Sequence, residues 1–287
     1  MKRKTLYVSD LDGTLLGEGS RLSQTSVTLL NHAISRGALI SVATARTPAT
    51  VNSLLRNVNF EVPLVVMTGA ALWDKATGRY SEVQYFTPER VREIIDAYRA
   101  AEDGGGFLYT LKRRPEGRDL MEIYHIGPIN DMERGFMQER ISNPFKCFFV
   151  PDSGVSDIPE SVDNAVLFFG MQPNAIAEKI LDRLYRIKDI NPMSYHDWYG
   201  PEVTEVEAFP PGATKAKAIQ RLKEKVGADR VVVFGDNMND LTMMGIADWS
   251  VAVSNAIPEV KDAADEVIGS NTADAVARYI LEDLGES

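Results

Sequence analysis

YVSDLDGTLLGEG, residues 7–19, sets an apolar run directly against two carboxylates. Burying a carboxylate is costly unless a partner compensates its charge, so Asp10 and Asp12 mark either a surface turn or a site built around a cation. Side chains at positions i and i+2 of an extended chain point the same way, so both carboxylates can face one ligand. Gly13 and Thr14 allow a tight turn and offer backbone N–H groups to an anion. Taken alone, Asp-x-Asp-Gly is also typical of a plain turn or of part of a calcium loop.

Apolar runs like the one that ends at Asp10 recur along the chain. They are rich in β-branched residues and do not alternate with polar ones, which is typical of parallel strands covered on both faces. Helical patterns follow several runs, with Ser23 as a candidate N-cap, Gly37 as a C-terminal stop and Lys215 at the start of a later helix. This alternation predicts an α/β fold with a doubly wound, Rossmann-like parallel sheet. The runs are TLYVS, ALISVA, VPLVVM, RVVVF and WSVAV.

The alternation of strands and helices breaks after about residue 85. The next hundred or so residues begin with a helix capped by Thr87 and opened by Pro88, followed by alternating stretches, another helix, two strands and a last helix. This texture predicts a smaller α+β domain, a cap, inserted into the first domain. We therefore expect a discontinuous core of residues 1–85 and 191–287 and a cap of residues 86–190.

A second acidic cluster, GDNMND at residues 235–240, also follows an apolar run. In open α/β sheets ligands gather outside the carboxyl ends of the strands, where Asp10 and Asp236 are expected to lie. If Asp10, Asp12, Asp236 and Asp240 converge, their mutual repulsion requires a cation. Ligands that are all oxygen favour a hard ion such as Mg²⁺, which takes one or two carboxylates together with a substrate phosphate. The two clusters thus predict a site for Mg²⁺ and phosphate.

Thr44 and Lys215 have the chemistry that a phosphate site needs. Thr44 ends the second apolar run and can donate its hydroxyl to a phosphate oxygen, and Lys215 brings a positive charge to a helix start. Each residue alone is a weak signal, because threonine at a strand end is most often a cap and lysine on a helix is usually solvated. What favours a phosphate site is the order along the chain, in which Thr44 and then Lys215 lie between the two acidic clusters.

This order of motifs resembles the haloacid dehalogenase (HAD) superfamily of phosphohydrolases. The matching residues are Asp-x-Asp-Gly-Thr at 10–14, Thr44 after a strand, a lone Lys215, and Gly-Asp-x-x-Asn-Asp at 235–240. The position of the insert and the tail SVAVSNAIPEVKDAADEVIGSN are similar to the Cof-type (HAD-IIB) branch with a C2 cap. The resemblance spans both ends of the chain, whereas the insert matches only in position and texture.

The resemblance implies a role for each motif residue. Asp10 is then the nucleophile that forms an aspartyl phosphate, and Asp12 is the general acid and base. The implied ligands of the Mg²⁺ cofactor are Asp10, Asp12, Asp236 and Asp240. The implied phosphate-binding residues are Gly13, Thr44, Ala45, Lys215 and Asn239.

Two positions depart from the family pattern. This chain has TAR at residues 44–46 where family members usually have Thr-Gly-Arg, and TGA at residues 68–70 where they have Asn-Gly-Ala. Ala45 is harmless if its φ is negative. Thr68 removes an amide that in family members helps to hold the phosphate region, so we expect it to affect efficiency or the phosphate pose.

Composition bounds the class of protein. The chain has 287 residues, 44% hydrophobic and 25% charged, which is ordinary globular composition. Its net charge of -10 disfavours nucleic acid and acidic membranes as partners. One cysteine excludes an internal disulfide and suits a reducing cytosol, and no apolar run reaches the ~18 residues of a spanning helix. We expect a cytoplasmic protein, a monomer or weak homodimer, whose partner is a small phosphorylated metabolite.

The expected function is a Mg²⁺-dependent phosphohydrolase that cleaves small phosphorylated metabolites, with sugar phosphates favoured. Three alternatives stay open: a phosphomutase, a dedicated sugar-phosphate phosphatase of the same branch, and a binding or regulatory protein without turnover. A mutase returns phosphate to its substrate, so an assay of inorganic phosphate separates it from a phosphatase. A dehalogenase is disfavoured because it would need neither Asp12 nor the metal ligands.

Three stretches are candidates for contact with the leaving group, two within the insert and one shortly after it. KRRPEGR at residues 112–118 is a charged loop, which is more often plain solvated surface. His125 lies in an alternating strand and either lines a cavity or takes an ordinary face position. YHDWYG at residues 195–200 is aromatic and either stacks on a sugar ring or packs a hinge.

Overall fold

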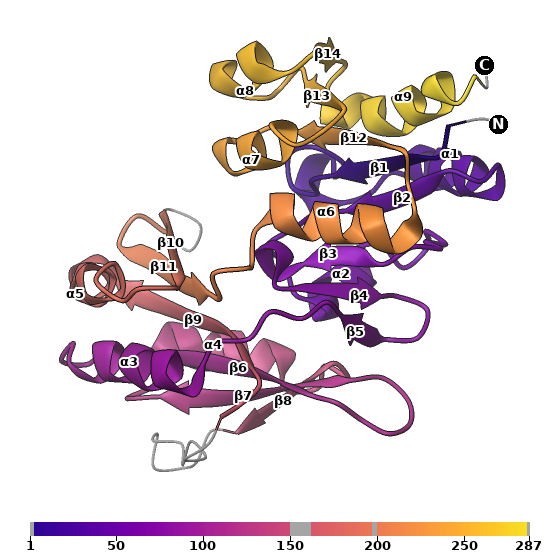
Figure 1. The fold of residues 1–287 in the computed structure, drawn as a ribbon. Helices are drawn as coiled ribbons and strands as arrows, with labels where there is room; N and C mark the ends of the chain where they lie inside the picture. Colours follow the sequence, from indigo (N-terminus) through magenta and orange to yellow (C-terminus); the bar gives the residue numbers. More distant parts are fainter. Residues whose placement is uncertain (1–2, 150–161, 197–199, 286–287) are drawn as a thin grey trace. The chain divides into compact units, whose positions relative to one another are not determined.

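The chain forms two compact units in the computed structural model, which describes residues 3–149, 162–196 and 200–285 (Figure 1). Unit 1 is discontinuous and consists of Met1–Glu82 and Thr214–Ser287. Unit 2 is the intervening Val83–Ala213. One unit is therefore inserted into the other along the chain.

Unit 1 is built on a parallel sheet of five strands in the order β14-β13-β12-β1-β2. β1 and β12 are buried along nearly their whole length, as expected for strands covered on both faces. The predicted α/β fold with a parallel-sheet core is confirmed. The edge strand β14 was not predicted, because three residues carry no periodic signal. The strands are β1 (Thr5–Ser9), β2 (Leu39–Val42), β12 (Arg230–Gly235), β13 (Trp249–Val253) and β14 (Glu266–Ile268).

The helices of unit 1 begin where the sequence places cap residues. The Ser23 hydroxyl accepts the Ser26 N–H at 2.8 Å at the start of α1 (Gln24–Ser35), and α6 (Lys215–Val226) begins at Lys215. Both predicted starts are confirmed. The other helices are α2 (Pro48–Leu54), α7 (Leu241–Met244), α8 (Pro258–Ala263) and α9 (Ala275–Asp283), with the 3₁₀ turns η1 (Glu18–Ser20), η2 (Met67–Gly69), η3 (Met238–Asp240) and η4 (Asn271–Ala273).

One run predicted as a strand of the parallel sheet lies in a separate hairpin. VPLVVM supplies β3 (Leu64–Val66), which pairs antiparallel with β4 (Ala71–Asp74), and β4 pairs with β5 (Arg79–Ser81). For this run the prediction is wrong, apart from a single parallel bridge at Val65. The reason is the turn η2, whose three residues all have positive φ and send the chain back on itself.

Unit 2 has its own sheet of six strands in the order β10-β11-β9-β6-β7-β8, antiparallel except between β7 and β8. Residues of α3 and α5 share a hydrophobic core with one face of this sheet. This is the α+β texture predicted for the insert, and the cap of α3 at Thr87 is confirmed. The elements are α3 (Pro88–Arg99), β6 (Gly106–Lys112), β7 (Leu120–Ile126), α4 (Asp131–Arg140), β8 (Lys146–Phe149), β9 (Ala165–Pro173), α5 (Asn174–Leu184), β10 (Asn191–His196) and β11 (Val203–Phe209).

The insert ends later in the chain than residue 190. The sequence placed residues 191–213 in the core, but β10 and β11 extend the sheet of unit 2 through pairing with β9. An alternating run such as VTEVEAF suits a strand of either unit, and only its long-range pairing decides between them. Unit 1 resumes at Thr214, one residue before Lys215.

The stretches named as candidate contacts with the leaving group all belong to unit 2. His125 is fully buried, with Nε2 3.0 Å from Oε2 of the equally buried Glu133, so it lines no open surface. In the charged loop, Arg113 donates to Asp119 at 2.9 Å. Residues 197–199 of the aromatic stretch lie outside the described residues.

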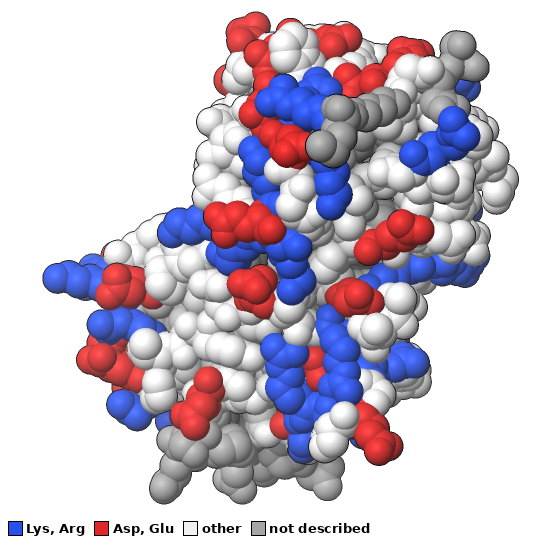
Figure 2. Space-filling view, turned by 45° about the vertical axis from the view of Figure 1, so that its right-hand side comes forward, with Lys and Arg blue, Asp and Glu red and all other residues white. Residues whose placement is uncertain are grey.

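None of the helices in the described part of the chain is both long and apolar enough to cross a membrane. On the face drawn in Figure 2, acidic and basic side chains are interspersed and do not gather into a large field of one sign. A continuous basic patch is the electrostatic footprint of nucleic-acid binding, and this face does not have one.

Candidate active site

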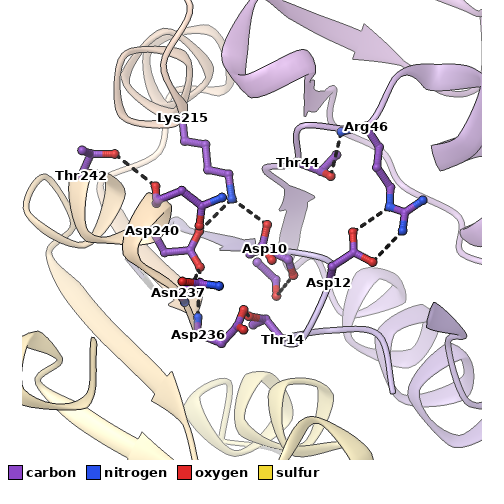
Figure 3. A network of polar contacts seen from close by, with 12 residues as sticks. Asp10, Asp12, Thr14, Thr44, Arg46, Lys215, Asp236, Asn237, Asp240 and Thr242 are labelled. Atoms are coloured by element: carbon purple, nitrogen blue, oxygen red, sulfur yellow. Dashed lines mark hydrogen bonds and ion pairs between the residues drawn. The ribbon is translucent and has the colours of Figure 1, made fainter. Parts of the chain in front are cut away.

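Two acidic loops leave neighbouring strands of unit 1. β1 ends directly before Asp10, and β12 ends directly before Asp236. The two strands are parallel, with Ser9 opposite Phe234, and the Asp10 N–H donates to the Phe234 carbonyl at 2.9 Å. Because the carboxyl ends of parallel strands lie at one edge of a sheet, both ends of the chain bring carboxylates to the same place (Figure 3).

Three of the four predicted metal ligands come together. Asp10, Asp236 and Asp240 each offer a carboxylate oxygen, and these oxygens lie within 4.8 Å of one another. Asp10 and Asp240 are buried. Carboxylate oxygens without histidine or cysteine suit a hard divalent cation such as Mg²⁺. We call these three residues the carboxylate cluster.

Lys215 places a positive charge within the carboxylate cluster. It is the first residue of α6, whose N-cap Thr214 accepts the Lys217 N–H at 3.2 Å. The Lys215 Nζ donates to Oδ1 of Asp10 at 2.6 Å and to Oδ1 of Asp240 at 2.7 Å (Figure 3). Only 3% of the lysine side chain is exposed, so solvent screens these ion pairs little.

The loops that carry the cluster are joined by further hydrogen bonds. Oδ2 of Asp240 accepts the N–H groups of Asp236 at 3.0 Å and of Asn237 at 3.2 Å. From the other loop, the Thr14 hydroxyl donates to Oδ1 of Asp236 at 2.6 Å. The Asp240 carboxylate is therefore held by its own loop and by Lys215, and the Asp236 carboxylate is held by a hydroxyl of the other loop.

Burial dominates the electrostatics of the cluster. Desolvation raises the pKa of Asp10; the ammonium of Lys215 opposes this effect, and the charges of Asp240 and Asp236 add to it. Burial disfavours the charged form of Lys215 too, but Asp10 and Asp240 outweigh it, and the pKa of the lysine is raised. Desolvation also raises the pKa of Asp236. One lysine therefore does not balance the negative charge, and a divalent cation would.

Gly13 takes a backbone position that other residues would not tolerate. Its φ is +81°, and a Cβ built there would lie 2.4 Å from Oδ2 of Asp236. A side chain would be strained and would displace the carboxylate. The tight turn predicted after Asp12 is present, and it packs directly against the second acidic loop.

Asp12 lies outside the carboxylate cluster. The Arg46 guanidinium donates twice to it, from Nε to Oδ2 at 2.6 Å and from Nη2 to Oδ1 at 2.7 Å (Figure 3). The Ser20 hydroxyl also donates to Oδ1, at 3.2 Å. The Asp12 side chain is 35% exposed, so solvent reaches it more readily than it reaches Asp10. The structure thus pairs the Asp12 carboxylate with Arg46, whereas the sequence grouped it with the metal ligands.

The other predicted phosphate-binding residues lie around the same edge of the sheet. Thr44 is buried shortly after β2, the other neighbour of β1, and its hydroxyl oxygen accepts the Arg46 N–H at 3.1 Å. Ala45 does not have a positive φ, so the departure from glycine causes no strain there. Asn239 is exposed in η3, next to Asp240.

Sequence reasoning assigned no role to Arg46 or to the hydroxyl of Thr14. Arg46 is 34 positions from Asp12, and a lone arginine gives no local signal at that separation. A signal was nevertheless present, because Asp12 and Arg46 each follow one of two strands that a doubly wound sheet places side by side. Residues at neighbouring strand ends are candidates for pairing even when they share no motif.

Comparison with known proteins gives matches over nearly the whole chain. A family model described as haloacid dehalogenase-like hydrolase matches residues 7–280. The 5-amino-6-(5-phospho-D-ribitylamino)uracil phosphatase YcsE of Bacillus subtilis is 24% identical over 280 residues, which cover 96% of this chain and 94% of that protein. The pyridoxal phosphate phosphatase YbhA of Escherichia coli is 23% identical over 277 residues, covering 96% and 97%.

Solved structures share the fold. A haloacid dehalogenase-like hydrolase from Bacteroides thetaiotaomicron has a TM-score of 0.71 at 23% identity and covers 98% of this chain and 100% of its own. The HAD subclass IIB sugar phosphatase BT4131 has a TM-score of 0.66 at 20% identity, with coverage of 98% and 99%. Similarity at this level of identity establishes the fold and leaves the substrate open.

Proposed function

This chain belongs to the haloacid dehalogenase-like hydrolase family and is a phosphatase, and we propose that it depends on Mg²⁺ and prefers sugar phosphates among small phosphorylated metabolites. The observation that carries the proposal is the meeting of Asp10, Asp236 and Asp240 with Lys215 at one edge of the sheet. These groups are a nucleophile, a ligand set for a hard cation and a fixed positive charge, which phosphoryl transfer requires together.

Asp10 is the proposed nucleophile. Its carboxylate oxygen attacks the phosphorus of a bound monoester, the bond to the leaving oxygen breaks, and an aspartyl phosphate forms. Lys215, which contacts Asp10 in the structure, offsets the repulsion between the carboxylate and the incoming phosphate. Thr44 is proposed to donate its hydroxyl to a phosphate oxygen, and Gly13, Ala45 and Asn239 are the further phosphate contacts that the family motifs imply.

Asp12 is the proposed general acid and base. It gives a proton to the leaving oxygen, and it then takes a proton from the water that attacks the aspartyl phosphate and releases inorganic phosphate. The two hydrogen bonds from Arg46 fix the direction in which the Asp12 carboxylate points. After the first step Asp12 is ionised and ready to act as the base, and the proton that it takes from water in the second step restores its acid form.

The donor set of the carboxylate cluster fits Mg²⁺, and Asp10, Asp236 and Asp240 are the residues that would hold it. When bound, such an ion supplies positive charge beside the nucleophile and the transferring phosphoryl group. Asp12 also stays a proposed ligand of Mg²⁺. To bind the ion, its carboxylate has to leave Arg46, or another atom of Asp12 has to serve as the ligand.

The proposed place of action is the cytoplasm, and the proposed substrate is a small molecule. One cysteine in the chain suits a reducing compartment, and a net charge of -10 disfavours nucleic acid as a substrate. Unit 2 is proposed to choose the leaving group.

A substrate panel tests the proposal. It contains hexose and pentose phosphates, pyridoxal phosphate, 5-amino-6-(5-phospho-D-ribitylamino)uracil and a generic aryl phosphate, each assayed for inorganic phosphate with Mg²⁺ and with a chelator. We expect phosphate release that is highest on a sugar phosphate and is lost in the chelator. Turnover that survives complete chelation would contradict Mg²⁺ dependence, and isomerised substrate without free phosphate would indicate a mutase.

The Asp10→Asn variant tests the assigned nucleophile. We expect it to lower turnover by roughly three orders of magnitude or more while the protein stays folded, because no aspartyl phosphate can form. Asp229→Asn is the matched control: Asp229 accepts the Lys4 N–H at 2.9 Å just before β12, at the opposite end of that strand from Asp236. A fully active Asp10→Asn variant would rule out the assignment.

A further inference from the structure

The connection between β13 and α8, residues 254–257, contacts both acidic loops. The Ile257 N–H donates to the Asp236 carbonyl at 3.0 Å. Asn255 reaches the other loop, where its Nδ2 donates to the Gly13 carbonyl at 2.7 Å. One short segment near the C-terminus therefore holds the backbone of the loops that present Asp10 and Asp236.

The side-chain amide of Asn255 is oriented by donors on its other side. Its Oδ1 accepts the Asn271 N–H at 3.0 Å and faces the Ser270 hydroxyl at 3.4 Å. Asn271 in turn donates from Nδ2 to the Leu16 carbonyl at 2.8 Å. With the Asn255 oxygen turned towards these donors, its nitrogen is left to face Gly13.

The peptide that Asn255 holds is a sensitive point of the site. Gly13 stands between Asp12 and Thr14, and it packs so closely on Asp236 that a Cβ would lie 2.4 Å from Oδ2. Thr14 donates to the same carboxylate at 2.6 Å. A small movement of the Gly13 peptide would therefore move Asp12, the Thr14 hydroxyl and the carboxylate of Asp236 together.

We propose that Asn255 is a positioning residue for the reaction, whose side-chain amide fixes the Gly13 turn and thereby the relation between Asp12 and the carboxylate cluster. Asn255 does not touch the reacting atoms, and the inference rests on the proposed phosphatase function. Residues that orient catalytic or metal-binding groups from behind typically change activity or metal affinity by roughly tenfold to a hundredfold when replaced.

The chain offers a matched control in Asn31 of α1. Its Nδ2 donates to the Asn57 carbonyl at 2.8 Å, and its Oδ1 accepts the Asn59 N–H at 2.8 Å. Asn31 is half-buried whereas Asn255 is exposed, but it makes the same pair of contacts to backbone groups and has no hydrogen bond to either acidic loop. Alanine at either position removes comparable bonds, so the two variants should lose similar stability.

The test compares Asn255→Ala with Asn31→Ala in the full-length protein. One measurement is kcat and KM for the best substrate of the panel, and the other is the rise in Tm that Mg²⁺ causes in the absence of substrate. For Asn255→Ala we expect kcat to fall roughly tenfold to a hundredfold with a smaller change in KM, together with a smaller Mg²⁺-induced rise in Tm. For Asn31→Ala we expect wild-type values of both.

A second substitution at position 255 covers the case in which alanine prevents folding. If Asn255→Ala does not fold, Asn255→Asp replaces it, because it keeps the shape and the acceptor for Asn271 but loses the donor to Gly13; it should show the same loss, with Asn31→Asp as its control. Wild-type kcat and a wild-type Mg²⁺ effect in the Asn255 variants would overturn the inference. If the wild-type protein releases no phosphate from any substrate, the proposed function fails, and the Mg²⁺-induced change in Tm alone then supports or overturns the positioning role.

Discussion

Thr68 occupies a backbone conformation that threonine rarely adopts. Its φ is 54°, and its buried hydroxyl oxygen has no hydrogen-bond partner among the described residues. A left-handed conformation costs an L-residue about 1–2 kcal/mol, and asparagine tolerates it better. We expect Thr68→Asn to raise the free energy of unfolding by about 1 kcal/mol, measured by urea denaturation, whereas Thr25→Asn in α1 should not. A Thr68→Asn protein less stable than wild type would refute the account of strain.

Glu207 is a buried carboxyl in β11, and Oε2 lacks a hydrogen-bond partner within the described residues. Burial, with the nearby charge of Glu205, raises the pKa of Glu207 from an ordinary 4.5 to about 8. The folded protein therefore keeps a proton that the unfolded chain releases, so this group stabilises the fold at low pH and loses its contribution as pH rises towards 8.

Glu207→Gln should remove this pH dependence. From about pH 5 to about pH 8 we expect wild type to lose on the order of 3 kcal/mol of stability relative to the variant, a magnitude that follows from the size of the shift. Urea unfolding of both proteins across this range measures the difference. Parallel pH curves for the two proteins would show that the carboxyl is ionised in the folded state.

Arg46 fixes Asp12 through two parallel hydrogen bonds, which lysine cannot reproduce. We expect Arg46→Lys to lower kcat about tenfold or more, because the Asp12 carboxylate is free to turn away from the leaving group. Arg230→Lys serves as the control, since Arg230 also binds a carboxylate twice, but from the single atom Nη1 to both oxygens of Asp283 at the start of β12. Equal kcat values for wild type and Arg46→Lys would show that the clamp has no catalytic role.

At the scale of elements, the first turn of α6 links stability to the site. Thr214 caps α6, whose first residue is Lys215, and Thr87 caps α3 of unit 2 in the same way, with Oγ1 accepting an N–H at 3.2 Å and 3.3 Å respectively. Replacement of either threonine by alanine should cost about 1 kcal/mol of stability. Only Thr214→Ala should also lower kcat, because Lys215 shifts with the turn; denaturation and steady-state kinetics of both variants measure this. An unchanged kcat in Thr214→Ala would show that the helix cap does not position Lys215 for catalysis.

Elements with strong local signals could be predicted from the sequence, and those defined by long-range pairing could not. Apolar runs and cap residues located β1, β2, β12, β13 and the starts of α1, α3 and α6. The hairpin that begins at β3 was missed, because its turn depends on positive φ at Met67 and Thr68, which these residue types do not signal. The assignment of β10 and β11 to unit 2 depends on pairing with β9, which alternation alone does not determine.

At the scale of the whole molecule, the site is formed by segments from both ends of the chain. Asp10, Asp236 and Lys215 could be predicted because each stands at the end of a strand or the start of a helix, and a doubly wound sheet brings those positions together. The pairing of Asp12 with Arg46 could not be predicted from the sequence. The spacing of Asp-x-Asp places both carboxylates on one side of an extended chain, but after the strand ends the direction of a side chain is set by neighbours that are distant in sequence.

The central claim is that Asp10, Asp236 and Asp240 form one binding site for a divalent cation. Calorimetric titration of Mg²⁺ into wild type, Asp236→Asn and Asp248→Asn tests it most directly; Asp248 accepts the Val231 N–H near the opposite end of β12 and is the control. We predict one site in wild type and in Asp248→Asn, and affinity at least about tenfold weaker in Asp236→Asn. Equal Mg²⁺ affinity in all three proteins would contradict the account.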